Sequence, residues 1–288
     1  MRTYLTVVFL GIVSLVFSQK PTIPFYFEEL TSPQMAEAIQ LSGKTCIIPL
    51  GILEKHGPHL PVGTDLLESR ELTRRAVSTE YAVVFPQYYF GQIFEAKHQP
   101  GVIAYSNQLV WNILQETCDE LARNGFEKII LVNGHGGNNS FLPYFCQSQL
   151  ASKKNYAVYL FTPDENDEYN QKIKSMRKSK GPDQHAGETE TATMLTHRPD
   201  LVHLDAANSQ SGEDQNRLKL DFAYTGIWWY AKFPNHYSGD GKVAAKELGE
   251  YIYSFNTDQL VKMIRSVKAD AQTLLLQKEF YDRAIAPK

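Results

Sequence analysis

Four short apolar runs constrain most strongly what this 288-residue chain can fold into. They cover residues 45–51, 81–86, 128–132 and 156–161. Nearly continuous apolar runs of this length are typical of strands that are buried on both faces of a sheet. Helical patterns lie between the runs, at residues 65–80, 106–124 and 140–153. The alternation predicts an α/β fold with a mostly parallel central sheet and helices on both faces.

The rest of the chain adds no second domain to this pattern. Residues 162–184 are polar, and their basic run, KIKSMRKSKG, lies close to acidic residues, so we expect a surface helix and loop. Residues 242–281 predict two more helices. No linker interrupts the chain, and we therefore expect residues 19–288 to form a single domain. The net charge of -3 gives no support for a nucleic-acid partner.

The first 18 residues have the pattern of a signal peptide. Arg2 supplies the positive charge, and an uncharged apolar stretch covers residues 4–17. Val16 and Ser18 are small residues at the two positions that a signal peptidase recognises. The alternative is an uncleaved membrane anchor, but the stretch is short for a span of roughly 20 residues. Cleavage before Gln19 predicts an exported protein, secreted or periplasmic, without stable membrane insertion.

The segment from Ile47 to Leu67, IIPLGILEKHGPHLPVGTDLL, carries a dense group of ionisable side chains. Glu54 and His56 are two residues apart, so in an extended segment both side chains point to one side. The Gly- and Pro-rich stretch that follows should turn sharply and bring Asp65 back at the start of a helix. Two carboxylates and one imidazole suit Zn²⁺, Mn²⁺ or Fe²⁺. A satisfied ion-pair network is the alternative.

Two further motifs carry histidines. His135 lies in NGHGGNN, directly after the apolar run 128–132, where the flanking glycines let the backbone approach a bound group. Two interpretations are possible: His135 is a metal ligand, or the stretch is a phosphate-binding loop. The stretch matches neither G-x-G-x-x-G nor the P-loop pattern, which counts against the second interpretation. The motif HAGETET begins with His185 and places Glu188 and Glu190 in the first turn of a helix. Favourable acids at a helix N-terminus explain the glutamates but not the histidine.

Together these motifs resemble the creatininase family, the creatinine amidohydrolases and their relatives. The resemblance rests on LGILEKHGPHLPVGTD, LVNGHGGNN and HAGETET, and more weakly on SGDGKVAAKELG. The four stretches extend over about residues 45–250, which is most of the chain. The resemblance implies an α/β fold with a site for two metal ions, in homo-oligomers that are commonly hexamers.

The resemblance also implies a role for individual residues. In the first two motifs these are Asp65 as a bridge between the metal ions, Glu54 and His135 on one ion, and His56 on the other. Creatininase itself has a glutamate two residues after the histidine of the second motif, where this chain has Gly137. Relatives with the His-Gly-Gly-Asn form replace it with the glutamate of His-Ala-Gly-Glu. The resemblance therefore implies Glu188 as the fifth ligand.

The expected reaction is hydrolysis of a cyclic or linear amide-type C–N bond by a water that two divalent ions activate. Zn²⁺ is the first expectation, with Mn²⁺ or Fe²⁺ as alternatives, and no other cofactor is expected. His185 matches the family's catalytic histidine and would pass a proton to the leaving nitrogen. Glu190 would orient a ligand. The expected partner is a small-molecule amide substrate.

Several alternatives remain open. Relatives act on creatinine, on formamide groups of pyrimidine intermediates and on a peptide, so a family metallopeptidase or deformylase is one alternative. A non-catalytic exported binding protein is another, although the presence of His185 favours an enzyme. His59 could support a ligand or stabilise its turn. The cluster Trp228-Trp229-Tyr230 is expected to pack in a core or a subunit interface rather than to wall a substrate pocket.

Overall fold

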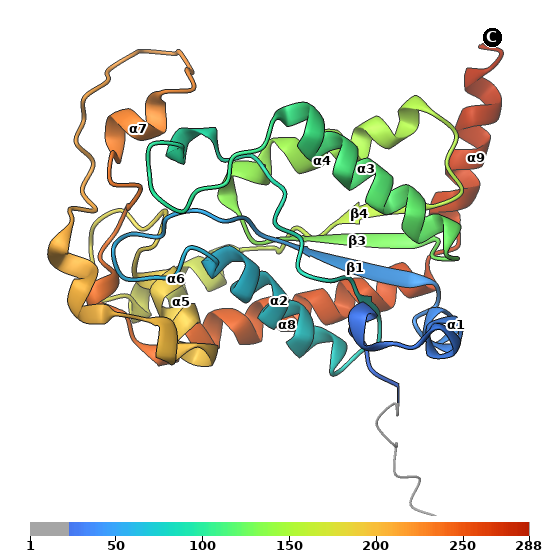
Figure 1. The fold of residues 1–288 in the computed structure, drawn as a ribbon, viewed down its shortest axis with the longest axis horizontal. Coiled ribbons are helices and arrows are strands. Elements are labelled where there is room, and N and C mark those ends of the chain that lie inside the picture. Colours follow the sequence, from blue (N-terminus) through green and yellow to red (C-terminus); the bar gives the residue numbers. More distant parts are fainter. Residues whose placement is uncertain (1–22, 288) are drawn as a thin grey trace, which may run out of the picture.

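A computed structural model describes residues 23–287 of the chain. The expected signal peptide, residues 1–18, lies outside the described residues. Four parallel strands form one sheet in the order β2-β1-β3-β4 (Figure 1). Their bounds are Thr45–Leu50 for β1, Val83–Val84 for β2, Lys128–Asn133 for β3 and Ala157–Leu160 for β4. The predicted α/β class is confirmed, and β2 is shorter than the apolar run 81–86 predicts.

Helices surround this sheet, and most of them follow the patterns in the sequence. Their bounds are α1 Ser32–Leu41, α2 Thr64–Val77, α3 Asn107–Arg123, α4 Phe141–Ser148, α5 Asp167–Met176, α6 Glu188–His197, α7 Trp228–Lys232, α8 Lys246–Ala269 and α9 Gln272–Ala284. The sequence pattern gives no expectation for α1 and α7. Among residues 23–287, every helix is too short or too polar to cross a membrane.

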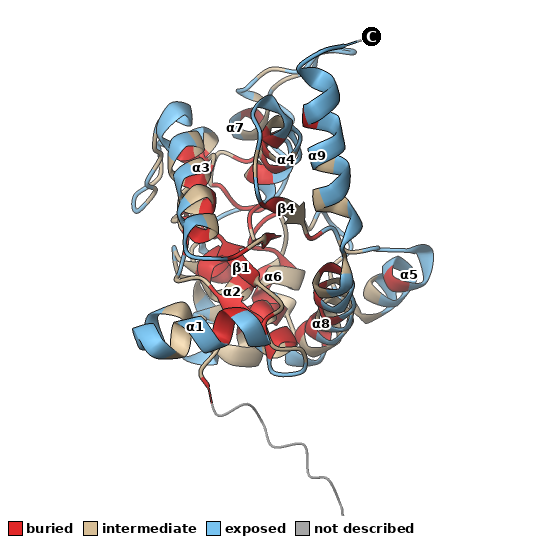
Figure 2. Ribbon diagram, turned by 90° about the vertical axis from the view of Figure 1, so that its right-hand side faces the viewer, coloured by how far each residue is buried: buried red, intermediate tan, exposed pale blue. Residues whose placement is uncertain are grey.

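The two faces of the sheet are covered by different helices. On one face Ile48 of β1 packs in a cluster with Leu114 of α3 and Phe145 of α4. On the other face Ile47 packs in a second cluster with Leu260 of α8 and residues of α2. Figure 2 shows the buried residues on the strands and on the inner sides of these helices, while α9 is mostly exposed. The sheet is therefore the rigid centre on which the site is built.

The topology of the sheet creates a natural ligand site. The chain passes from β1 outward to β2 and then returns past β1 to β3, so the direction of winding reverses between β1 and β3. These two strands end in register, with Leu50 paired to Asn133. Ligands of open α/β sheets bind outside the carboxyl ends of the strands at such a switch point. Glu54 and His135 follow the two strands at this position.

Two glycines let the first turn of α2 lie directly on these strand ends. A Cβ atom on Gly51 would lie 2.6 Å from the backbone carbonyl carbon of Asp65. A Cβ atom on Gly134 would lie 2.7 Å from the backbone oxygen of the same residue. Both distances are shorter than a Cβ atom tolerates, so only glycine permits this approach. The close contact brings the carboxylate of Asp65 to the end of the sheet.

Candidate metal centre

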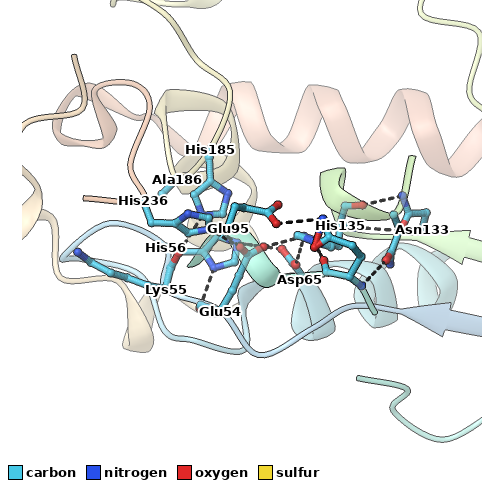
Figure 3. Close-up of polar contacts among 12 residues, drawn as sticks. Glu54, Lys55, His56, Asp65, Glu95, Asn133, His135, His185, Ala186 and His236 are labelled. Carbon is cyan, nitrogen blue, oxygen red and sulfur yellow. Dashed lines mark hydrogen bonds and ion pairs between the residues drawn. The ribbon is translucent and has the colours of Figure 1, made fainter. Parts of the chain in front are cut away.

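Three side chains from different elements converge where β1 and β3 end (Figure 3). Glu54 comes from the extended segment after β1, Asp65 from the first turn of α2, and His135 from the turn after β3. All three are buried. Nδ1 of His135 lies 2.7 Å from Oε1 of Glu54 and 3.1 Å from Oδ2 of Asp65. We call these three residues the floor of the site.

A second group of side chains adjoins the floor through Asp65. Nε2 of His56 lies 2.8 Å from Oδ1 of Asp65, so the two carboxylate oxygens face different histidines. The ring of His185 lies 4.3 Å from the ring of His56, measured between centroids. Nδ1 of His185 lies 3.9 Å from Oε2 of Glu190. Atoms of His56, His185 and Glu190 lie close enough to one another to hold a cation, as do those of the floor.

The sequence analysis missed His236, which also lies at this site (Figure 3). Backbone hydrogen bonds pair His185 with Ser238, and this bridge brings His236 beside Glu54. Nε2 of His236 lies 2.5 Å from Oε2 of Glu54. The available signal was its position two residues before Ser238, at the start of the fourth and weakest motif. That position alone indicates no site, because the sequence does not show that Ser238 pairs with His185.

The hydrogen bonds of the histidines show that a divalent cation fits between them. His56, His135 and His185 each place one ring nitrogen 2.7–3.2 Å from a backbone carbonyl oxygen. A carbonyl oxygen only accepts, so that nitrogen must donate an N–H. In the neutral ring the other nitrogen then carries a lone pair, and it faces carboxylates. Among the described residues, Oε1 of Glu54 and Oδ2 of Asp65 are buried without a hydrogen bond.

The same arrangement perturbs the pKa values of the site. Burial alone would lower the pKa of His56, but the carboxylates of Asp65 and Glu54 raise it to about 10. Burial would likewise lower the pKa of His135, but Glu54 and Asp65 raise this pKa well above the usual value. Conversely, burial lowers the pKa of His236 to about 4, so this ring is neutral. The floor is a strongly negative, buried environment that attracts either protons or a metal cation.

Residues 28–264 match the family model of the creatininases, which is described as creatinine amidohydrolase. This match spans most of the chain. The chain belongs to the creatininase family. The resemblance that the sequence motifs indicate is therefore confirmed.

Similar proteins include a creatinine amidohydrolase from Pseudomonas putida, which is 28% identical over 119 residues, or 40% of this chain. That alignment spans less than half of the curated relative, 46% of its length. A mycofactocin precursor peptide peptidase from Mycobacterium ulcerans is 26% identical over 227 residues, covering 76% of this chain and 83% of the peptidase.

A solved structure of creatinine amidohydrolase superposes with a TM-score of 0.72 at 20% identity, covering 86% of this chain and 99% of that chain. At this identity the superposition shows a shared fold. Solved creatininases include one described as Zn-Zn type and one described as creatininase Mn. Metal ions are thus a documented feature of solved structures with this fold.

Of the glutamates in the third motif, the structure brings Glu190 rather than Glu188 to the creatininase-family site. The carboxylate of Glu188 accepts hydrogen bonds from the backbone N–H groups of Lys178 and Ser179, at 2.7 and 2.8 Å. It also lies near Arg177, so its oxygens have partners away from the other ligands. The structure therefore does not bring Glu188 to the other expected ligands, and its role as the fifth ligand stays a prediction. Glu190, predicted to orient a ligand, lies beside His56 and His185 instead.

Two other expectations concern side chains around the site. His59 does not join the cluster: its Nε2 lies 2.8 Å from the Thr191 hydroxyl, which ties the turn to α6. The aromatic residues of α7 line a cavity of about 950 Å³ above the floor, together with other residues. The structure thus favours the alternative that these residues wall a pocket, and their place in a subunit interface stays a prediction. We call the aromatic lining the wall: Phe94, Tyr224, Trp228, Trp229 and Tyr230.

Proposed function

We propose that the protein is a metal-dependent amidohydrolase with a site for two divalent ions. The observation that carries this proposal is the carboxylate of Asp65, whose Oδ1 faces His56 and whose Oδ2 faces His135. A carboxylate divided in this way can bridge two cations. The mixture of imidazole and carboxylate donors suits Zn²⁺ or Mn²⁺. Both metals appear in the descriptions of solved creatininases.

The remaining ligands divide between the two ions by position. Oε1 of Glu54 and Nδ1 of His135 would hold the first ion, because they lie 2.7 Å apart and neither is committed to a neighbouring carbonyl. Nε2 of His56 would hold the second ion. Glu190 would complete the second set, because it groups with His56 whereas Glu188 does not. This assignment retains four of the ligands that the family resemblance implies and replaces the fifth.

The reaction we propose is hydrolysis of an amide-type C–N bond. When bound, the ions would activate a water and polarise the substrate carbonyl. His185 would transfer the proton to the leaving nitrogen. Its Nε2–H donates to the carbonyl of Lys55 at 2.8 Å, which fixes the ring and leaves Nδ1 for proton transfer. An imidazole can both accept and release a proton near pH 7.

The cavity favours a substrate larger than a single small ring. Its volume of about 950 Å³ lies near the upper end of the range for ligand pockets. Lys97 and Glu95 line it beside the aromatic wall, so both apolar and charged groups could be accommodated. A peptide substrate is the second candidate, because the match to the mycofactocin precursor peptide peptidase extends over 83% of that protein.

Metal analysis and turnover of three variants test the proposal. Glu54→Gln, His56→Ala and Asp65→Asn should each bind less metal, with Asp65→Asn losing the most because it contacts both groups. Full metal retention in all three variants would contradict the proposal. Reconstitution with Zn²⁺, Mn²⁺ or Fe²⁺, followed by a screen of cyclic amides, formamides and short peptides, would separate the amidohydrolase from the deformylase and the peptidase.

A matched pair of variants tests the fifth ligand. The two glutamates stand in the same turn of α6, so their variants form a matched pair. Glu190→Gln should lower the metal content because Glu190 groups with His56 and His185, whereas Glu188→Gln should retain it. The reverse result would restore the assignment that the sequence resemblance implies. His185→Ala should keep the metal and lose turnover; unchanged turnover would contradict its role in proton transfer.

We also propose that the protein is exported and forms a homo-oligomer. The pattern of residues 1–18 and the family resemblance support these proposals. Side chains that are more than half exposed further support an assembly: Leu220, Phe222, Tyr224 and Ile227. Such a row of apolar side chains is typical of surfaces that another molecule covers. Amino-terminal sequencing and light scattering of the natively expressed protein would test both proposals.

A further inference from the structure

We propose that His236 and Trp229 are positioning residues that hold Glu54 in the orientation needed to bind a metal ion. The indole Nε1 of Trp229 lies 2.8 Å from Nδ1 of His236. The opposite nitrogen of the same ring, Nε2, lies 2.5 Å from Oε2 of Glu54. The three side chains therefore form a chain of hydrogen bonds from the aromatic wall to the floor. The proposal rests on the proposed role of Glu54 as a metal ligand.

The tautomer of His236 follows from the chemistry of tryptophan. An indole N–H can only donate a hydrogen bond, so Nδ1 of His236 must accept it. A neutral imidazole has one N–H, which then lies on Nε2 and is donated to Glu54. Binding a metal through Nε2 would require the proton on Nδ1, where it would point at the indole N–H. His236 is thus excluded as a ligand, although its position beside Glu54 and His185 is close enough for one.

The hydrogen bond from His236 gives the two carboxylate oxygens of Glu54 different partners. Oε2 accepts the imidazole N–H, while Oε1 faces His135 and has no hydrogen bond among the described residues. Glu54 can therefore present a single oxygen to a cation instead of binding it with both. Both side chains are buried, so water cannot easily replace a lost partner. Losing an outer partner of a metal ligand typically weakens metal binding by about 10- to 100-fold.

The tautomer can be observed directly in ¹⁵N-labelled protein by long-range ¹H–¹⁵N correlation spectra, with His236→Gln used to assign the signal. His236 should carry its proton on Nε2 in both metal-free and Zn²⁺-loaded protein at pH 7. Loss of that proton on addition of Zn²⁺ would overturn the proposal while leaving the two-metal function intact. A protein that kept this tautomer but bound no Zn²⁺ would contradict the proposed function, and with it the metal-binding purpose of the hydrogen bonds to Glu54.

Zn²⁺ affinity, measured by competition with a chromophoric chelator, tests the effect on Glu54. His236→Leu should weaken binding by about 10- to 100-fold, whereas His236→Gln should retain most of it because its amide N–H can replace the imidazole donor. Equal weakening in both variants, with one ion fewer bound, would identify His236 as a ligand. Unchanged affinity in both would also overturn the proposal. His98→Leu is the control, because His98 lines the same cavity but contacts the Pro234 carbonyl.

A second pair of variants tests the indole and does not depend on the folding of His236→Leu. Trp229→Phe keeps an aromatic ring but removes the N–H, so His236 should populate both tautomers and Zn²⁺ affinity should fall by several-fold. Trp228→Phe is the matched control, since Trp228 lines the same cavity and packs edge-on against Trp229 at 5.4 Å. An unaltered tautomer and affinity in Trp229→Phe, or equal effects in both variants, would contradict the proposal.

Discussion

The floor and the wall enclose one cavity but are built in opposite ways. The floor residues lie at the ends of two central strands and at the start of a helix that contacts those strands through its backbone. The wall comes largely from the segment around α7, which extends away from the sheet (Figure 1). Its neighbour Phe222 is fully exposed and Tyr224 is 84% exposed. We propose from this contrast that the fold fixes the positions of the metal-binding side chains, whereas the exposed segment around α7 selects the substrate.

Trp229 connects the wall to the floor. This residue belongs to the wall, yet its indole N–H contacts His236, which contacts Glu54 in the floor. A substrate that moved Trp229 would therefore also act on the floor. Changes in the floor should alter stability and metal binding together, and changes in the wall away from Trp229 should alter only substrate affinity.

The largest expected effect is the pH dependence of stability in the metal-free protein. The pKa of His56 is raised from 6.5 in an ordinary environment to about 10 in the folded chain. Its contribution to the free energy of unfolding is fully present below pH 6.5, falls as pH rises from there to about 10, and is absent above. A total loss on the order of a few kcal/mol is expected. Urea unfolding between pH 6 and 10 in the presence of a chelator measures it.

Two variants separate this effect from general alkaline destabilisation. His56→Gln should flatten the pH dependence between pH 6.5 and 10, although His135 contributes with the same sign and should preserve part of it. His98→Gln, at the edge of the cavity, should keep the wild-type slope. An identical slope in His56→Gln and the wild type would show that the floor carboxylates do not hold a proton on His56.

A smaller effect is expected from a methyl group placed under the floor. Gly51→Ala would put its Cβ 2.5 Å from the backbone nitrogen of Leu66, and a backbone atom cannot move aside as a side chain can. We expect a loss of about 1–3 kcal/mol in the free energy of unfolding, together with weaker metal binding. Gly136→Ala is the control, because its Cβ would meet no atom within 4 Å. Equal stability of the two variants would show that the backbone of α2 can move away from the strand ends at little cost.

The smallest change in stability is expected in the wall. Trp228 is only half-buried and lines the cavity, so Trp228→Ala should change the free energy of unfolding by no more than about 1 kcal/mol. Its effect should appear in KM, which should rise about 3- to 10-fold if the ring contacts the substrate, with kcat and metal content retained. A fall in metal content would show that the wall and the floor are not separable at this residue.

The sequence was sufficient to predict the parts of the site that depend on local pattern. The apolar runs predict β1 and β3, and the register of these strands explains why Glu54 and His135 meet. Spacing by two in an extended segment places His56 beside Glu54, and the Gly- and Pro-rich turn before α2 places Asp65 at the start of that helix. Each of the elements that bring these residues together can be predicted from a few neighbouring positions in the sequence.

Two features of the site that the sequence did not reveal, the positions of Glu190 and His236, arise from long-range packing. Glu188 and Glu190 are two residues apart on α6, so their side chains point to different sides of the helix and only one can face the site. Which one does so depends on the segment before α6, whose Lys178 and Ser179 N–H groups engage Glu188. His236 reaches Glu54 across 182 positions of sequence. No local periodicity carries information of this kind.

The contact of Gly51 and Gly134 with the backbone of Asp65 has a consequence for redesign. The separation between the strand ends and the helix is set by main-chain atoms that touch, so a larger or smaller side chain cannot adjust it gradually. An engineer who wanted a different metal ion would have to exchange donor atoms at a fixed spacing. The aromatic segment offers the opposite freedom, since its side chains other than Trp229 can be varied without moving the donors.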